Sequence, residues 1–220
     1  MTEERAGIRT EMITRKNSST GWAPVNEPMT ITFKNLSYHV MIDDLGAKRN
    51  RFSFASLPKV EKTIIDNISG VFLRGKLTAI MGTSGAGKTT MLKAIAGQAA
   101  GGKITGSVHI NGISMDTDTM SKHTGFVFQD DVILDTMTIR EAISMSAMLR
   151  LPGSMHSEEK QRYVDQVIEM LHLKKCANSF IGSSSDKGGV SGGERKRCSI
   201  GMELVVNPSI LYLDEPTTGM

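Results

Sequence analysis

The sequence predicts an α/β fold that also carries an antiparallel β region near its N-terminus and a helical insertion. Two short apolar runs, at 77–81 and 210–213, fit buried parallel strands and end in a glycine loop and an acidic pair. Apolar and polar residues alternate over 29–40, which favours a strand or a hairpin. Helical patterns fill most of 131–186, between the two strand-bearing parts.

Bulk composition excludes several classes of protein. The chain has 220 residues, of which 39% are hydrophobic and 22% charged, as in soluble globular proteins. A net charge of +3 is too mild to indicate a nucleic-acid partner. No apolar run approaches the ~20 residues that span a bilayer, and Glu3 and Glu4 do not fit a secretory signal. Cys176 and Cys198, the two cysteines, fit a reducing compartment.

A glycine-rich loop joins the apolar run at 77–81 to a segment with helical spacing at 89–96. Its glycines let backbone amides approach an anion closely, and the helix that follows adds its N-terminal dipole. Lys88 supplies a charge for the β- and γ-phosphates, and Thr89 supplies a hydroxyl for Mg²⁺. The pattern therefore predicts a site for ATP or GTP. The predicted nucleotide-binding residues are Gly82, Thr83, Ser84, Gly85, Ala86, Gly87, Lys88, Thr89 and Thr90.

Two acidic residues follow the apolar run at 210–213. In a nucleotide site, Asp214 would hold Mg²⁺ through its water shell, and Glu215 would polarise the attacking water. Consecutive residues at a strand end point to different sides, so the two carboxylates can take separate roles. Taken alone, the pattern also fits an ordinary strand that leaves the sheet through a charged turn at Pro216.

A second glycine loop opens a helix near residue 191. Ser191 and Glu194 form a capping box, which specifies the start of the helix. Gly192 and Gly193 are unfavourable in a first helical turn unless something approaches the backbone closely. These four residues therefore predict a second phosphate site. One compact monomer cannot easily aim both loops at one nucleotide, whereas a head-to-tail dimer can.

These motifs resemble those of ABC-transporter nucleotide-binding domains, over about 29–220, and their details resemble the G subfamily of white-type eukaryotic half-transporters. The segments that carry the resemblance are Phe128-Gln129-Asp130-Asp131, Val190-Ser191-Gly192-Gly193-Glu194-Arg195-Lys196-Arg197, Ser199-Ile200-Gly201-Met202-Glu203-Leu204 and Asp214-Glu215-Pro216-Thr217-Thr218-Gly219. The resemblance implies a P-loop NTPase core of ABC ATPase type, with an N-terminal antiparallel β subdomain and an inserted helical subdomain.

This gives four expected parts of the chain. Residues 1–26 are polar and lack periodicity, which predicts a mobile tail. The ATP-binding core with its antiparallel β subdomain is expected at 27–130, and the helical subdomain at 131–186. The signature helix and the strand with the acidic pair are expected at 187–220.

By the resemblance, Gln129 is the Q-loop residue, which would contact Mg²⁺ and the attacking water. Tyr38 would be the aromatic residue that stacks on adenine. A half-buried strand tyrosine fits it equally well, because the polar loop at 42–60 lengthens its spacing to Gly82. The basic run 195–197 fits a solvated face or a domain contact better than a nucleic-acid patch.

The function implied by the resemblance is the ATPase engine of an exporter, which uses MgATP to move a lipid, sterol or xenobiotic. The implied partners are a second half-transporter, identical or different, and the protein's own membrane domain, with no nucleic acid. The domain would lie at the cytosolic face of a membrane. The alternatives are a soluble ABC ATPase acting on ribosomes or chromosomes, and a non-catalytic truncated regulator of partner half-transporters. The chromosome type would need a long coiled coil between Gln129 and Ser191, where only 61 residues intervene.

The last residues depart from the family pattern. Met220 stands where the family has the leucine of its D-loop, and all five histidines precede Glu215, so the switch histidine has no counterpart. We therefore expect an N-terminal fragment or a truncated product that binds ATP weakly and hydrolyses it poorly.

Overall fold

The computed structural model describes 28–44, 58–114, 120, 123–182 and 189–217. The predicted tail at 1–26 lies outside these residues. Contacts group the chain into two compact units, divided along the sequence between Ser121 and Lys122. Each unit combines strands with helices, in agreement with the predicted α/β class.

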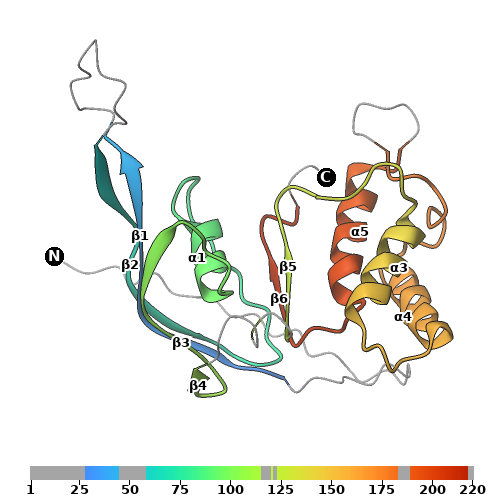
Figure 1. Ribbon diagram of the computed structural model, residues 1–220, viewed down its shortest axis with the longest axis horizontal. Helices are drawn as coiled ribbons and strands as arrows, with labels where there is room; N and C mark the ends of the chain where they lie inside the picture. The colour runs from blue at the N-terminus through green and yellow to red at the C-terminus, as the bar shows by residue number, and fades with distance from the viewer. Residues whose placement is uncertain (1–27, 45–57, 115–119, 121–122, 183–188, 218–220) are drawn as a thin grey trace, which may run out of the picture. The chain divides into compact units, whose positions relative to one another are not determined.

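The first unit is built on a four-stranded antiparallel sheet with the strand order β2-β1-β3-β4 (Figure 1). Strand β1 (Ile31–Asp43) pairs with β2 (Lys59–Phe72) on one side and with β3 (Gly102–Ile110) on the other. β1 covers the predicted alternation at 29–40. It buries Ile31 and Phe33, and after a register shift between Phe33 and Leu36 it buries Leu36 and Tyr38. The predicted antiparallel region is thereby confirmed.

A tight turn joins β3 to the short strand β4 (Ile113–Ser114). Both of its central residues have positive φ, 50° at Asn111 and 81° at Gly112. This is the requirement of a type I′ turn, for which Asn-Gly is the preferred pair. The dipeptide alone therefore favours this turn in the sequence.

The strand expected at 77–81 does not form. The structure assigns it no strand, and Leu77 and Met81 are 63% and 89% exposed. A parallel strand is stabilised by backbone hydrogen bonds to a neighbour, and no strand in the described part of the chain pairs with this run. The prediction of a buried strand here was wrong, because an apolar run specifies burial only when a partner strand covers it.

Among its described residues, the second unit combines a two-stranded parallel sheet with the helices α3, α4 and α5 (Figure 1). Strand β5 (Thr124–Val127) pairs with β6 (Ile210–Leu213). Between them in sequence come α3 (Ile139–Arg150), α4 (Ser157–Met170) and α5 (Gly192–Leu204). β6 and the start of α5 lie where the sequence predicts them, and α3 and α4 fall within the helical stretch expected at 131–186.

The three helices share one apolar core. Ile143, Val167 and Leu173 are completely buried within it. Gly201 of α5 faces this core, and a Cβ atom built there would lie 2.9 Å from Cδ1 of Ile143 and 3.3 Å from Cγ1 of Val167. The absence of a side chain at this position therefore lets α5 pack closely against α3 and α4.

We expect Gly201→Val to lower the free energy of unfolding by about 2 kcal/mol, because its branched side chain overpacks this contact. Urea denaturation monitored by circular dichroism would measure the loss. Gly153→Val is a matched control, because a Cβ atom there meets nothing within 4 Å. Equal stability of the two variants would contradict a close contact at Gly201.

Candidate functional site

The predicted phosphate loop leads directly into α1 (Lys88–Ile95) in the first unit. Gly85 and Gly87 have φ values of 78° and 85°, which only glycine adopts without strain. Gly87 is also the N-cap of α1, and it has no side chain that could cap the helix. A helix start without a side-chain cap leaves amide donors for an anion.

The Lys88 side chain folds back over this loop. Its Nζ donates to the carbonyl oxygens of Gly82, at 3.1 Å, and Thr83, at 3.0 Å. The ammonium group therefore lies over the loop, where a bound phosphate would attract it away from the carbonyls. The loop residues before Gly87 are exposed.

An apolar cavity lies beside Lys88, between β2 and the start of α1. It has a volume of about 290 Å³, and Ile64, Ile68, Ile80 and Met91 contribute to its lining. Asp66 and Lys88 add charged groups to a lining that is otherwise mainly aliphatic.

Tyr38, which the resemblance assigned to stacking on adenine, lies in the core of the sheet. Its side chain is 5% exposed, and its hydroxyl donates to the carbonyl oxygen of Ala100 at 2.8 Å. A Cβ atom at Gly102 would lie 2.6 Å from the tyrosine ring, so the neighbouring strand covers that side. This burial favours the structural role that the sequence left open for Tyr38.

In the second unit, β5 and β6 bring three predicted residues to the same edge of their sheet. Val127 pairs with Leu213 at the carboxyl ends of both strands, and the amide of Asp214 donates to the carbonyl oxygen of Val127 at 3.0 Å. Gln129 follows β5, whereas Asp214 and Glu215 follow β6. Ligands of parallel sheets bind at this edge.

The two carboxylates differ in their surroundings. Asp214 is 3% exposed, whereas Glu215 is exposed and has a positive φ of 46°. Non-glycine residues with positive φ are uncommon and cluster at functional sites. The difference in exposure matches the separate roles expected for the two side chains.

The second glycine loop forms the predicted capping box at the start of α5. The Ser191 Oγ accepts from the amide of Glu194 at 3.3 Å. The Glu194 Oε2 accepts from both the amide and the hydroxyl of Ser191, each at 2.8 Å. The backbone and hydroxyl of Ser191 hold the pKa of Glu194 below its ordinary value, so this carboxylate is charged at neutral pH.

For the basic run after the capping box the sequence left open a solvated face or a domain contact, and the burial of Lys196 argues against the solvated face. Lys196 is 2% exposed, and its ammonium group contacts the segment that follows β5. Arg195 donates to Asp135 and to the carbonyl oxygen of Gly182. Both contacts lie inside the second unit. The acidic residues at 131 and 135 were the only sequence features that could have predicted these ion pairs. No local pattern links them to basic residues on a helix some 60 positions later.

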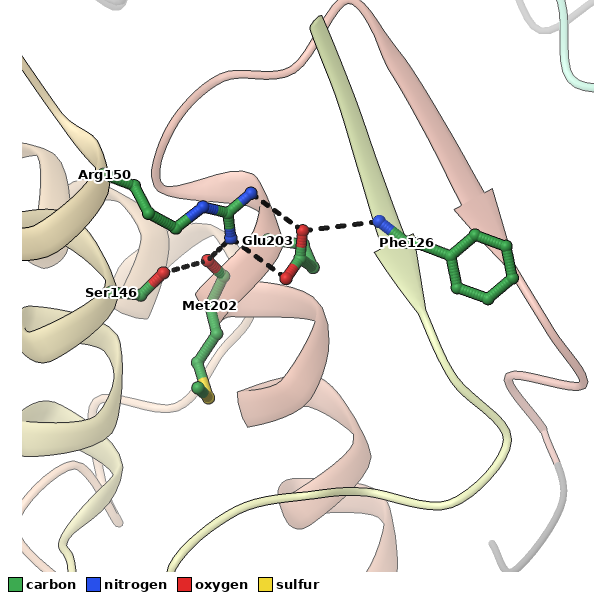
Figure 2. A network of polar contacts seen from close by, with 5 residues as sticks. All are labelled: Phe126, Ser146, Arg150, Met202 and Glu203. Atoms are coloured by element: carbon green, nitrogen blue, oxygen red, sulfur yellow. Dashed lines mark hydrogen bonds and ion pairs between the residues drawn. The ribbon is translucent and has the colours of Figure 1, made fainter. Parts of the chain in front are cut away.

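A second polar network surrounds the C-terminal end of α5 (Figure 2). The guanidinium of Arg150 makes two hydrogen bonds of 3.0 Å to the carboxylate of Glu203, which also accepts from the amide of Phe126 at 3.3 Å. The Ser146 hydroxyl and Arg150 both donate to the carbonyl oxygen of Met202. The network joins α3, α5 and β5 one residue before β5 ends.

The predicted residues therefore fall into two groups. The phosphate loop and Tyr38 lie in the first unit, and the remaining candidates lie in the second. The described residues contain no cluster of three or more histidine, cysteine or acidic side chains that would hold a metal by itself. The oxygen donors predicted for Mg²⁺, at Thr89, Gln129 and Asp214, are hard ligands that suit this ion together with phosphate oxygens.

The family model for ABC transporters matches residues 65–218. The chain belongs to the ABC transporter family. It is 43% identical over 192 residues to a probable ATP-dependent permease of Saccharomyces cerevisiae, covering 87% of this chain and 17% of that protein. ABC transporter G family member 21 of Arabidopsis thaliana is 41% identical over 193 residues, 88% of this chain and 28% of that protein.

ABC transporter G family member 24 of Dictyostelium discoideum is 42% identical over 190 residues, 86% of this chain and 16% of that protein. These similarities confirm the resemblance of the ABC transporter domain to the G subfamily. The chain spans less than a third of the length of these curated relatives. Among the described residues, no helix has the length and apolar content needed to cross a bilayer.

The two cysteines lie near the signature helix in different environments. Cys198 is completely buried, and this burial, together with the Asp131 carboxylate, raises its pKa to about 12. Cys176 is half-buried, and burial and the Glu194 carboxylate raise its pKa to a smaller extent. Both are free thiols.

We expect a disulfide reagent at pH 8 to modify the folded chain at Cys176 at least tenfold faster than at Cys198, because only the thiolate reacts. The measurement compares Cys198→Ala, which retains Cys176, with Cys176→Ala, which retains Cys198. Denaturant should abolish the difference. Equal rates in the folded state would show that Cys198 is accessible.

Proposed function

We propose that this chain is the ATP-binding and ATP-hydrolysing domain of an exporter of the G subfamily, which moves a lipid, sterol or xenobiotic across a membrane. The chain covers only part of the length of its relatives. The membrane domain, the transport activity and the position of the ATP-binding domain at the cytosolic face are therefore parts of the proposal. One observation carries the catalytic part: α1 begins at a glycine loop with no side-chain cap, directly beside Lys88.

The contrast between helix starts supports a phosphate at this position. α3 and α5 each have a side-chain cap that satisfies first-turn amides, whereas α1 and α4 have none. α4 carries Glu158 and Glu159 in its first turn, which disfavour an anion there, whereas the first turn of α1 holds no acidic residue. A triphosphate would accept from the amides of the loop and of α1 and would draw the Lys88 ammonium from its two carbonyl partners. The aliphatic cavity next to Lys88 offers an apolar surface for the nucleobase.

The residues at the edge of the β5–β6 sheet suit hydrolysis. Glu215 is exposed and would accept a proton from the attacking water, and Gln129 would orient that water. Asp214 and the Thr89 hydroxyl would hold Mg²⁺, with Gln129 as a further ligand. When bound, this ion neutralises charge on the phosphate oxygens during cleavage.

The position of two anion sites on one chain supports a head-to-tail dimer. The amides at the start of α5 and the Ser191 hydroxyl would complete the nucleotide site of a second half-transporter, identical or different. The names of the relatives, a permease and G-family transporters, support export over a soluble ATPase.

We expect Lys88→Ala to weaken ATP binding at least tenfold in the full-length protein, because it removes the only side-chain cation of the loop. Glu215→Gln should retain binding while kcat falls about 100-fold or more, as loss of a general base predicts. Fluorescent-nucleotide titration and phosphate release in vesicles would separate the two effects. Wild-type turnover in Glu215→Gln would remove Glu215 from the reaction.

We expect Glu194→Gln to lower KM for ATP about two- to fivefold, because it removes a charged carboxylate from a phosphate site while an amide oxygen still caps α5. Glu141→Gln is the matched control, since Thr138 and Glu141 form the same capping box at the start of α3. The control should leave KM unchanged. A similar change of KM in both variants would show that the loss of a helix cap, rather than the charge near the phosphate, causes the effect.

A further inference from the structure

The segment between β5 and α3 is attached to α5 through its backbone. Residues 128–134 have no helix or strand, so their carbonyl oxygens have no partners from regular structure. Three of these oxygens, those of Phe128, Gln129 and Ile133, accept from side chains of α5. The position of this irregular segment is therefore determined by a helix that follows it by about 60 residues in the sequence.

Lys196 provides the central attachment. Its Nζ donates to the carbonyl oxygen of Gln129 at 2.8 Å and to that of Phe128 at 3.3 Å. The same ammonium lies 2.8 Å from the Oδ1 of Asp131, as an ion pair without the geometry of a directed hydrogen bond. The lysine side chain is 3% exposed and that of Asp131 is 11% exposed.

Two of the three donors of this buried ammonium group are used by carbonyl oxygens, and the Asp131 carboxylate balances its charge. A buried ion pair adds little net stability compared with apolar residues of the same volume, whereas removing one partner is strongly unfavourable. General stability therefore does not account for a lysine here. Its geometric effect is specific: it ties two successive carbonyl oxygens of the chain to one point on α5.

Arg195 strengthens the same attachment on the neighbouring side. Its guanidinium contacts the Asp135 Oδ1 at 2.7 Å, the carbonyl oxygen of Gly182 at 2.6 Å and that of Ile133 at 3.4 Å. These contacts lie farther along the segment, away from Gln129. Lys196 alone reaches the Gln129 backbone.

We propose that Lys196 is a positioning residue that fixes the backbone of Gln129 to the first turns of α5. Gln129 and Ser191 are then carried by one rigid piece of the second unit. The inference rests on the proposed function, in which Gln129 serves the nucleotide of its own chain and Ser191 serves that of the partner. The hydrogen bond from Lys196 to the Gln129 carbonyl oxygen would then connect the two nucleotide sites of the dimer.

The experiment measures steady-state ATP hydrolysis by the full-length protein in vesicles. We expect Lys196→Met to lower kcat about tenfold and to change KM less than twofold, because the phosphate loop is untouched. Lys160→Met is the matched control. Lys160 is also a buried lysine whose Nζ donates to two carbonyl oxygens, those of Met148 and Leu151, but it does not contact the segment after β5.

The control variant should lose thermal stability to a similar extent and keep kcat within twofold of the wild type. Equal losses of kcat in both variants would show that any buried lysine has this effect, and the proposal would fail. A Lys196→Met variant with wild-type kcat would also overturn it.

Two further variants keep the test decisive if Lys196→Met does not fold. Lys196→Gln retains one donor to a carbonyl oxygen and should recover part of the lost kcat. Asp131→Asn removes the ion pair but leaves both carbonyl contacts of Lys196, so its kcat should stay within twofold of the wild type. If Asp131→Asn loses as much as Lys196→Gln, the ion pair rather than the Gln129 backbone is responsible, and the proposal is wrong.

A double-mutant cycle identifies the residue through which Lys196 acts. When Gln129→Ala is already present, adding Lys196→Gln should lower kcat by less than a further twofold, because the side chain being positioned is absent. Independent multiplication of the two effects would overturn the proposal.

Hydrogen exchange separates this inference from the proposed function. The amides of 129–133 should exchange faster in Lys196→Gln than in the wild type and in Lys160→Gln, whether or not the protein hydrolyses ATP. The proposed function would be refuted if the wild-type protein hydrolysed no ATP, or if its hydrolysis did not depend on Lys88. Unchanged exchange in an active protein would refute the role of Lys196 alone.

Discussion

A charge that is removed from water must be matched by polar partners, and this constraint fixes the position of α5. Near its start, Lys196 is buried and binds backbone oxygens and a carboxylate beyond β5. Near its end, Glu203 binds Arg150 and the backbone of Phe126 (Figure 2). Strand β5 and the segment that follows it are consequently held to one helix at two points, and the carboxyl edge where the acidic pair lies is fixed with them.

The two glycine-rich loops solve the same problem in different ways. Both lead into a helix whose first amides need acceptors. At α1 a glycine occupies the N-cap and provides no side-chain cap, whereas at α5 the Ser191 and Glu194 side chains form a capping box. An anion would therefore enter the first loop without displacing a cap, while at the second it competes with a carboxylate.

Features whose partners are close in sequence were predictable. The capping boxes at Thr138 and Ser191 involve residues three positions apart, and the Asn111-Gly112 turn depends on two adjacent residues. The phosphate loop and the acidic pair were found because their motifs are local as well. The sheet pairing expected for 77–81 depends on another strand, and the contacts of Lys196 cross 67 and 68 positions, so neither outcome is encoded in a short window.

The capping box of α5 also shows how a helix can begin at the proposed phosphate site with its first-turn amides satisfied. The Glu194 carboxylate occupies the anionic position at the helix start and accepts from the Ser191 hydroxyl, which in the proposed function would bind the ligand. In that function the carboxylate would keep the first turn folded until the nucleotide of a partner chain arrives. If a phosphate displaced the Glu194 carboxylate, closure of the proposed dimer would exchange one anion for another at this loop. A neighbouring chain without nucleotide would provide no anion for that exchange.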